Sequence, residues 1–342
     1  MSRFSKNPGP RMTELLQRAG SNELTIRAEA THQLAKALEL PLRQGVLKGD
    51  IVGDIYEKEP LQPGVAAEYP LDLLTPGTED EYVAYTIPAQ GRIPEMHVQG
   101  DYVMVPTFEI GSSIDFATKY ARDARWNVVG RAMQVLEGSV VRKHNTDAWR
   151  CLISAGYNRF LNVYDDKVQP GFFSKRLVEL MKNVMRRQAG GNSTSVNRGR
   201  LDRLYVSPEA LGDIRTWDVT QVDPITRREL FVDDDLDRMK IFGVELRSID
   251  ELGVGQEFES YWETKLSASL PTYSLSSVSY TKLEIMVGLD LSHDGVFMNP
   301  VRQEFQVQED PTFARQRRVS FWGYAEGGWT VLDGRRVLIG SI

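Results

Sequence analysis

The chain has 342 residues, of which 41% are hydrophobic and 26% are charged, and its net charge is −6 at pH 7. This balance is typical of a globular protein and excludes a disordered or fibrous chain. The longest apolar runs are far shorter than the ~20 residues that cross a bilayer. The first residues also lack the apolar core of a signal peptide. We therefore expect no membrane partner, and a protein that is made and assembled in the cytoplasm.

Side chains that carry catalysis or bind metals are sparse. Cys151 is the only cysteine, and the four histidines are far apart in the sequence. The sequence lacks the phosphate-binding, dinucleotide-binding, nucleophile-elbow, CxxC and HExxH motifs. The acidic run at 233–237 resembles a calcium-binding loop, but Arg238 stands where such a loop needs glycine. We therefore predict no catalytic residue, no cofactor site and no metal site.

Charge alternates along the chain in long blocks. The net charge is +3 over 1–50, −10 over 51–118, +10 over 119–203, −12 over 204–310 and +3 over 311–342. Blocks of this size indicate surfaces that attract other copies of the same chain. The alternative is that folding mixes these charges on one solvated surface.

The first 50 residues predict a mobile, modestly basic arm followed by two helices. Residues 11–18 form the first helix, and the second runs from Ser21, its N-cap, to Leu40, where Pro41 ends it. We expect the buried stripe of the second helix to follow Leu24, Ala28, Thr31, Ala35 and Leu38. The basic side chains would suit a surface that faces nucleic acid, and an ordinary solvated helix face is the alternative.

Residues 51–100 are acidic and rich in proline and glycine, and no lysine occurs between Lys58 and Lys119. Such a segment breaks long regular elements. Alternation at 82–87 and 92–98 predicts a long hairpin with its turn near Gly91. A two-stranded hairpin is marginally stable in water. It therefore needs a partner surface.

A strand over 101–110 and a long basic helix over 113–142 follow, the helix capped by Ser112 or Ser113 and about 45 Å long at ~1.5 Å per residue. A shorter helix should run from 145 to 156. From 157 onward the pattern predicts a mixed α/β region. It contains a helix from Ser174 to 188, a strand at 201–206, a helix capped by Ser207, strands at 240–249 and 283–289, and antiparallel strands from 304 to 342.

This order of parts resembles the tailed-phage major capsid proteins of the Hong Kong 97 fold. The resemblance rests on the acidic hairpin, the long basic helix, and the stretches KRLVELMKNVMRRQ, RLYVSPEALGDIRTW and KIFGVELRSIDELG. It implies an α+β fold divided into the following parts. They are an N-terminal arm (1–50), an extended loop (51–100), a peripheral domain with the spine helix (101–156), an axial domain (157–300) and closing peripheral strands (301–342).

The resemblance also implies a function, which is a shell that closes from pentamers and hexamers around double-stranded DNA in the virion. The partners are then other copies of the chain, the portal and packaged DNA bound without sequence specificity, and a decoration protein is a further partner that the resemblance allows. We expect the acidic hairpin of one copy to lie against the basic helix of its neighbour. The side chains of this contact are Glu79, Asp80 and Glu81 on the hairpin and Arg122, Arg125 and Arg131 on the helix.

Two departures from the family refine the expectation. The sequence lacks the long N-terminal scaffold segment of some members, so a separate scaffolding protein is implied. Its hairpin lacks lysine, so the self-catalysed crosslink between lysine and asparagine is not expected there. Two alternatives stay open: an encapsulin-type compartment shell, which shares the fold, and an α/β enzyme with an unrecognised carboxylate site.

Overall fold

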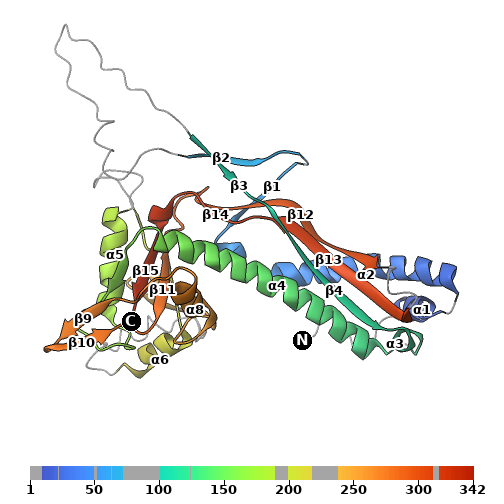
Figure 1. Cartoon of the computed structure of the whole chain (residues 1–342). Helices are drawn as coiled ribbons and strands as arrows, with labels where there is room; N and C mark the ends of the chain where they lie inside the picture. Colours follow the sequence, from blue (N-terminus) through green and yellow to red (C-terminus); the bar gives the residue numbers. More distant parts are fainter. Residues whose placement is uncertain are drawn as a thin grey trace, which may run out of the picture. The chain divides into compact units, whose positions relative to one another are not determined.

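The computed structural model describes residues 10–21, 23–49, 52–62, 64–71, 101–123, 125–188, 199–217, 238–310 and 316–342 (Figure 1). The chain divides into two compact units. Unit 1 comprises Met1–Glu68, Met104–Trp149 and Met298–Thr330, and unit 2 comprises Tyr69–Val103, Arg150–Phe297 and Val331–Ile342. Within the described ranges, none of the helices combines the length and hydropathy that a membrane span requires.

Unit 1 is built on a sheet whose strands come from distant parts of the sequence. Its order is β1 (Glu57–Pro60), β12 (Phe297–Asp310), β13 (Arg318–Gly327) and β4 (Phe108–Ala117), and β14 (Thr330–Val331) also pairs with β12. β12 and β4 both run antiparallel to β13. β4 pairs along its whole length, from Phe108 opposite Gly327 to Ala117 opposite Arg318. The antiparallel strands predicted near the C-terminus are therefore present, and β4 joins them.

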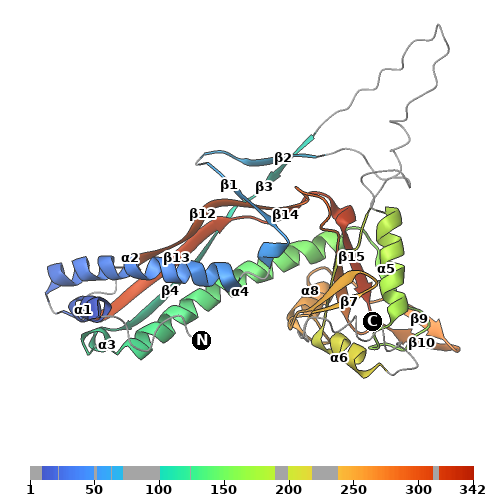
Figure 2. The same ribbon diagram turned by 180° about the vertical axis from the view of Figure 1, so that it is seen from behind.

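Helices cover one face of this sheet, as Figure 2 shows. They are α1 (Pro10–Ala19), α2 (Leu24–Gly49), α3 (Thr118–Arg122) and the part of α4 (Trp126–Tyr157) that precedes Arg150. The sheet contributes Phe305, Val307, Val319 and Phe321 to the shared core. Because these residues alternate along β12 and β13, one face of each strand meets the helices and the other does not. A short 3₁₀ helix, η1 (Val52–Asp54), leads into β1.

The predicted end of α2 at Pro41 is wrong, because the helix continues to Gly49. An interior proline costs about 3 kcal/mol. Leu38 and Leu42, on either side of it, are buried in the core, and each contributes about 1.5–3 kcal/mol. The predicted stripe is right in its second half, where Ala35 and Leu38 are buried, and wrong at its start, where Leu24 and Ala28 are exposed. Ser21 is not the N-cap, although its Oγ accepts a hydrogen bond from the N–H of Glu23 at 3.2 Å.

The predicted helix over 113–142 has the wrong beginning and the wrong end. Residues 113–117 belong to β4, where Ser113 lies opposite Trp322 and Asp115 forms a 2.8 Å ion pair with Arg318. α4 begins at Trp126 and runs without a break to Tyr157, so it includes the separate helix expected over 145–156. Its 32 residues span about 48 Å at ~1.5 Å per residue.

Unit 2 contains a six-stranded mixed sheet. Its order is β5 (Asn162–Tyr164), β15 (Val337–Ser341), β11 (Ile285–Leu289), β6 (Arg203–Val206), β8 (Val244–Ser248) and β7 (Arg238–Ile241). β15 comes from the segment 301–342 that we expected to close the other unit, and this expectation is therefore wrong for the last strand. The strand predicted over 240–249 is two strands, joined by Phe242 and Gly243 at φ values of 52° and 78°. A short 3₁₀ helix, η4 (Gly334–Arg336), precedes β15.

In the described part of unit 2, three helices belong wholly to this unit, and two of them begin at caps that the sequence predicts. Ser174 Oγ accepts from the N–H of Leu177 at 3.1 Å and begins α5 (Lys175–Gln188). Ser207 Oγ accepts from the N–H of Ala210 at 3.1 Å and begins α6 (Pro208–Thr216). Both helices bury apolar side chains in the core of this unit. The third helix, α8 (Glu257–Thr264), packs beside the end of α4, where Ser154 and Tyr261 share a 2.9 Å hydrogen bond.

Two further pairs of strands stand apart from the large sheets. β9 (Thr272–Leu275) and β10 (Val278–Thr281) form a hairpin of unit 2. β2 (Ala67–Leu71) pairs with β3 (Asp101–Val105). The single strand predicted over 101–110 is thus divided at Pro106, which lacks the N–H that a continuous ladder needs. The hairpin predicted at 82–87 and 92–98 lies outside the described residues.

Candidate functional site

The three arginines expected at a subunit contact are all exposed on unit 1. Arg122 ends α3, and its Nε lies 3.7 Å from the carboxylate of Asp123. Arg125 precedes α4, with its guanidinium 5.9 Å from the ring centre of Tyr120. Arg131 lies one and a half turns further along, on α4. The structure thus presents three cations to solvent on neighbouring elements, while Glu79, Asp80 and Glu81 lie outside the described residues.

The ring of Tyr120 has a second cation near it, in addition to Arg125. Lys119 Nζ lies 5.0 Å from the centre of the same ring. A cation near an exposed aromatic face gains about 0.5–1 kcal/mol, which holds a long side chain close to its base. This end of unit 1 is therefore a fixed cationic surface and suits an acidic partner.

Three large apolar side chains are exposed along β3 and the start of β4. Tyr102, Met104 and Phe108 are 69%, 66% and 62% accessible. Single exposed apolar residues are ordinary, but three large ones within seven sequence positions indicate a segment that another molecule covers. No motif or charge pattern in the sequence points to these residues. The alternation of Tyr102 and Met104 with two valines in β3 was the signal that could have found them.

The sheet face of unit 1 that the helices leave open carries an aromatic pair. The rings of Trp322 and Tyr324 on β13 stack with centres 4.6 Å apart. Glutamine side chains of β12 surround the phenol, whose hydroxyl accepts from Gln303 at 2.9 Å and from Gln308 at 3.2 Å. Because both rings are only half-buried, this face keeps aromatic area available for contact.

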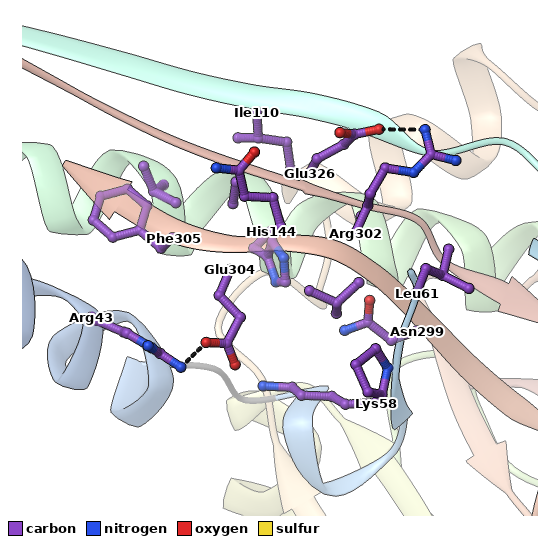
Figure 3. A pocket seen from close by; sticks show the side chains of 16 residues that line it. Arg43, Lys58, Leu61, Ile110, His144, Asn299, Arg302, Glu304, Phe305 and Glu326 are labelled. Carbon is purple, nitrogen blue, oxygen red and sulfur yellow. Dashed lines mark hydrogen bonds and ion pairs between the residues drawn. The ribbon is translucent and has the colours of Figure 1, made fainter. Parts of the chain in front are cut away.

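A pocket of about 280 Å³ opens on unit 1 between α2, β1, β12 and α4 (Figure 3). Two ion pairs frame it. Arg43 of α2 points at Glu304 of β12, and Arg302 lies 3.1 Å from Glu326. Arg302 also donates to the carbonyl of Val65 at 3.3 Å. The walls of the pocket are mostly apolar, and Lys58, His144, Asn299 and Gln303 also line it. The apolar lining comes from Leu61, Ile110, Val140, Val301, Phe305 and Ala325. The hydrogen bond to Val65 thus ties the segment after β1 to the sheet, and the ion pair of Arg43 with Glu304 ties α2 to β12.

A carboxyl group with a strongly raised pKa is buried in unit 2. The pKa of Glu284 is raised to about 7, mainly by burial and to a smaller extent by the charges of Glu209, Glu259 and Asp213. Ser207 donates a 3.0 Å hydrogen bond to Glu284, which lowers the pKa. A carboxyl beside a serine is what an α/β enzyme would need. Here both side chains are more than nine-tenths buried, and the serine also caps α6, so the pair is part of the core.

Two other buried carboxylates of unit 2 are paired with arginines. Arg336 donates to Asp290 at 2.7 Å, and both side chains are almost fully buried. Asp165 accepts from Arg176 at 2.6 Å and from Ser174 at 2.7 Å. These groups have the partners that buried charges require for stability. Among the residues that the structure describes, no group of histidine, cysteine and acidic side chains has the geometry of a metal site.

The fold is that of the phage capsid structures. No protein-family model and no curated protein matches the sequence. A structure of Microbacterium phage Oxtober96 matches with a TM-score of 0.54 at 10% identity, over 86% of this chain and 90% of that chain. The cyanophage Pam1 capsid matches with a TM-score of 0.54 at 12% identity, over 84% and 88%. The capsid of an empty GTA particle matches with a TM-score of 0.52 at 11% identity, over 86% and 90%.

These similarities confirm the fold that the sequence resemblance implied. The chain has the mixed helix and strand architecture of the Hong Kong 97 fold. At identities of 10–12% the similarity establishes the fold alone.

Proposed function

We propose that this chain is the major capsid protein of a tailed double-stranded DNA bacteriophage. Copies assemble into the pentamers and hexamers of an icosahedral head. The head forms in the host cytoplasm and encloses the genome in the virion. Two lines of reasoning support this function. The fold matches a cyanophage capsid and an empty GTA capsid over more than four-fifths of the chain. The same chain leaves large apolar side chains open to solvent.

The exposed group formed by Tyr102, Met104 and Phe108 is the observation that carries the proposal. Burying one such side chain contributes about 1.5–3 kcal/mol. A chain that acts alone gains nothing from exposing three of them together. In a shell, a neighbouring copy covers them, and the apolar area buried there holds the subunits together.

Charge has a second role in this proposal. The acidic segment with Glu79, Asp80 and Glu81 of one copy would lie against the arginines at 122, 125 and 131 of its neighbour. Each exposed ion pair contributes only ~0.2–1 kcal/mol. Charge therefore selects the register of neighbouring subunits, while the apolar contacts provide most of the binding free energy. A separate scaffolding protein and the portal complete the assembly.

The test is assembly of the purified chain, alone and with its scaffolding protein. Size-exclusion chromatography and electron microscopy should show capsomers or megadalton shells. Replacing Tyr102 and Met104 together by aspartate should leave circular dichroism unchanged and abolish shells. The conservative pair Tyr102→Phe and Met104→Leu should assemble normally. A wild-type chain that stays a small oligomer under all these conditions would contradict the proposal and favour an enzyme.

An encapsulin-type compartment remains the alternative of the same fold. The matched structures described above come from phages and a GTA particle, which favours the phage assignment. Particles that contain enzymes and no nuclease-protected DNA would favour the encapsulin instead.

A further inference from the structure

The outward face of α4 carries a regular seam of exposed residues. Its members recur at alternating steps of three and four, and all are exposed: Val128, Arg131, Val135, Gly138 and Arg142. Steps of three and four keep side chains on one stripe of a helix. We call this stripe the outward seam. From Val128 to Arg142 the seam rises by 14 residue steps, or about 21 Å at ~1.5 Å per residue.

A second stripe on the same helix is already used by the fold. Val129, Met133, Leu136 and Val140 have the same spacing and are fully buried in the core of unit 1. At ~100° per residue, Val135 lies on the side of the helix opposite Met133. α4 therefore has one seam that packs against its own unit and one that points away from it.

The outward seam has the apolar and small residues that helix packing needs. Val135 is 58% exposed and Val128 is 37% exposed. Gly138 lies on the same seam between Val135 and Arg142. A Cβ built on this glycine would have no atom within 4 Å. A glycine inside a helix costs about 1 kcal/mol relative to alanine. Nothing in the described part of the chain requires a small residue at 138. Gly138 therefore leaves room for a second molecule to approach α4 closely.

The charge of the seam restricts the partner. Exposed positions from Trp126 to Lys143 include Arg131, Arg142 and Lys143 and no acidic side chain, because Glu137 is only partly exposed. α4 of a second copy would bring arginines against arginines, which costs free energy. Nucleic acid would use the cations but gain nothing from the valines and the glycine. An acidic helix with apolar residues at heptad spacing matches all three features.

We propose that the outward seam of α4 docks an acidic amphipathic helix from a separate polypeptide. Apolar residues of that helix pack on the two valines and over the glycine, and its carboxylates face the two arginines. The docking surface lies within unit 1. It goes beyond the proposed shell function, because it requires only that unit 1 is folded. Since Arg131 also belongs to the proposed contact between copies, the helix docks on subunits that have not yet assembled.

The probe is a fluorescein-labelled synthetic peptide of about four heptads, with leucine at a and d and glutamate at e and g. Fluorescence anisotropy with the full chain should show saturable binding that weakens as salt is added. Val135→Glu and Arg131→Glu should each weaken binding at least about tenfold, because one buries a like charge and the other removes an ion-pair partner. Val278→Glu, at a valine of β10 that is 50% exposed, is the matched control and should bind as wild type.

Gly138→Ala separates docking from folding. The new methyl group meets nothing in the folded chain, so it should raise the unfolding midpoint. Because it fills the space that the partner helix approaches, it should weaken peptide binding at least about fivefold. Gly212→Ala in α6, where a Cβ also has open space, should raise the midpoint equally and leave binding unchanged.

Three results would overturn the proposal. One is the absence of saturable peptide binding to the wild-type chain. Another is equal binding of a peptide with lysine in place of every glutamate, or unchanged binding by Val135→Glu. The third is tight binding of a labelled DNA duplex that is lost with Arg131→Glu while the peptide fails to bind, which would make the seam a nucleic-acid surface. Shell assembly by the wild-type chain is measured separately, so either proposal can fail alone.

Discussion

Gly156, in the last turn of α4, lies directly against Ile339 of β15. A Cβ built on the glycine would be 2.6 Å from Cγ1 and 2.7 Å from Cδ1 of that isoleucine, which is fully buried. The end of α4 therefore packs on the sheet of unit 2 so closely that only glycine fits. This contact explains why α4 continues past 142, because its final turns pack against the sheet of unit 2.

Gly156→Ala should destabilise the protein. Overpacking a buried contact costs about 1–3 kcal/mol, and the helix preference of alanine returns only about 1 kcal/mol. The urea midpoint should therefore fall by an amount equivalent to roughly 1 kcal/mol. Gly212→Ala, which adds the same methyl group to a helix with open space around it, should be stabilising. Equal effects of the two substitutions would show that the contact with Ile339 relaxes freely.

Arg336→Met should be severely destabilising. It removes the guanidinium that lies 2.7 Å from Asp290, and the two side chains are 3% and 0% exposed. An unpaired buried carboxylate costs about 3–5 kcal/mol. The control is Arg318→Met, which breaks a 2.8 Å pair with Asp115 whose side chains are 52% and 38% exposed. That loss should be below about 1 kcal/mol. Calorimetry that gives similar losses for both variants would refute the distinction.

Local signals in the sequence were sufficient for the elements that begin at a cap. The helices after Ser174 and Ser207 start where the sequence predicts, because a side-chain oxygen next to the first turn satisfies an otherwise unpaired N–H. Pro208 adds a residue already suited to the first helical position. Neither signal depends on the rest of the fold.

The boundary between β4 and α4 could not be found in the same way. Residues 113–117 follow a helical pattern as well as an alternating one, and their strand is fixed by pairing with β13, about 200 positions later in the sequence. β15 likewise takes its place from neighbours in unit 2. The predicted contact between copies requires three exposed arginines, and all three are exposed. Its acidic half lies outside the described residues and stays a prediction.

Stability should respond to pH through Glu284. Its pKa is about 7 in the folded chain, against ~4.3 for an exposed glutamate. The folded state therefore binds a proton more tightly than the unfolded state, so this group favours folding below pH ~4 and loses that contribution as pH rises through 7. Glu284→Gln keeps the acceptor for Ser207 and cannot ionise.

The wild type and Glu284→Gln should therefore have similar stability at pH 5, and the variant should gain on the wild type up to pH 8. The difference in unfolding free energy should reach at most about 3 kcal/mol. Comparing the two chains cancels the titration of other carboxyl groups, such as Asp333, whose pKa is lowered mainly by hydrogen bonding to Arg335 against the effect of burial. A constant difference across this pH range would show that Glu284 titrates normally.

Charge reversal at Arg122 and Arg125 should stop assembly without unfolding the subunit. Both side chains are exposed, and their visible partners within the chain are Asp123 and the ring of Tyr120. Replacing both by glutamate should leave the thermal midpoint within a few degrees of wild type, since surface substitutions usually change stability by less than about 0.5 kcal/mol. In a shell, the two substitutions change the local charge from +2 to −2 at every contact with an acidic neighbour.

The matched control is the double variant Arg122→Lys and Arg125→Lys, which keeps the charge and should form shells that weaken at high salt. Electron micrographs of the glutamate variant should show capsomers or aggregates instead of closed particles. Normal particles from that variant would count decisively against the acidic contact, while leaving the apolar surface at Tyr102 and Met104 as the basis of assembly. Because the two surfaces are changed by different substitutions, their contributions can be measured separately.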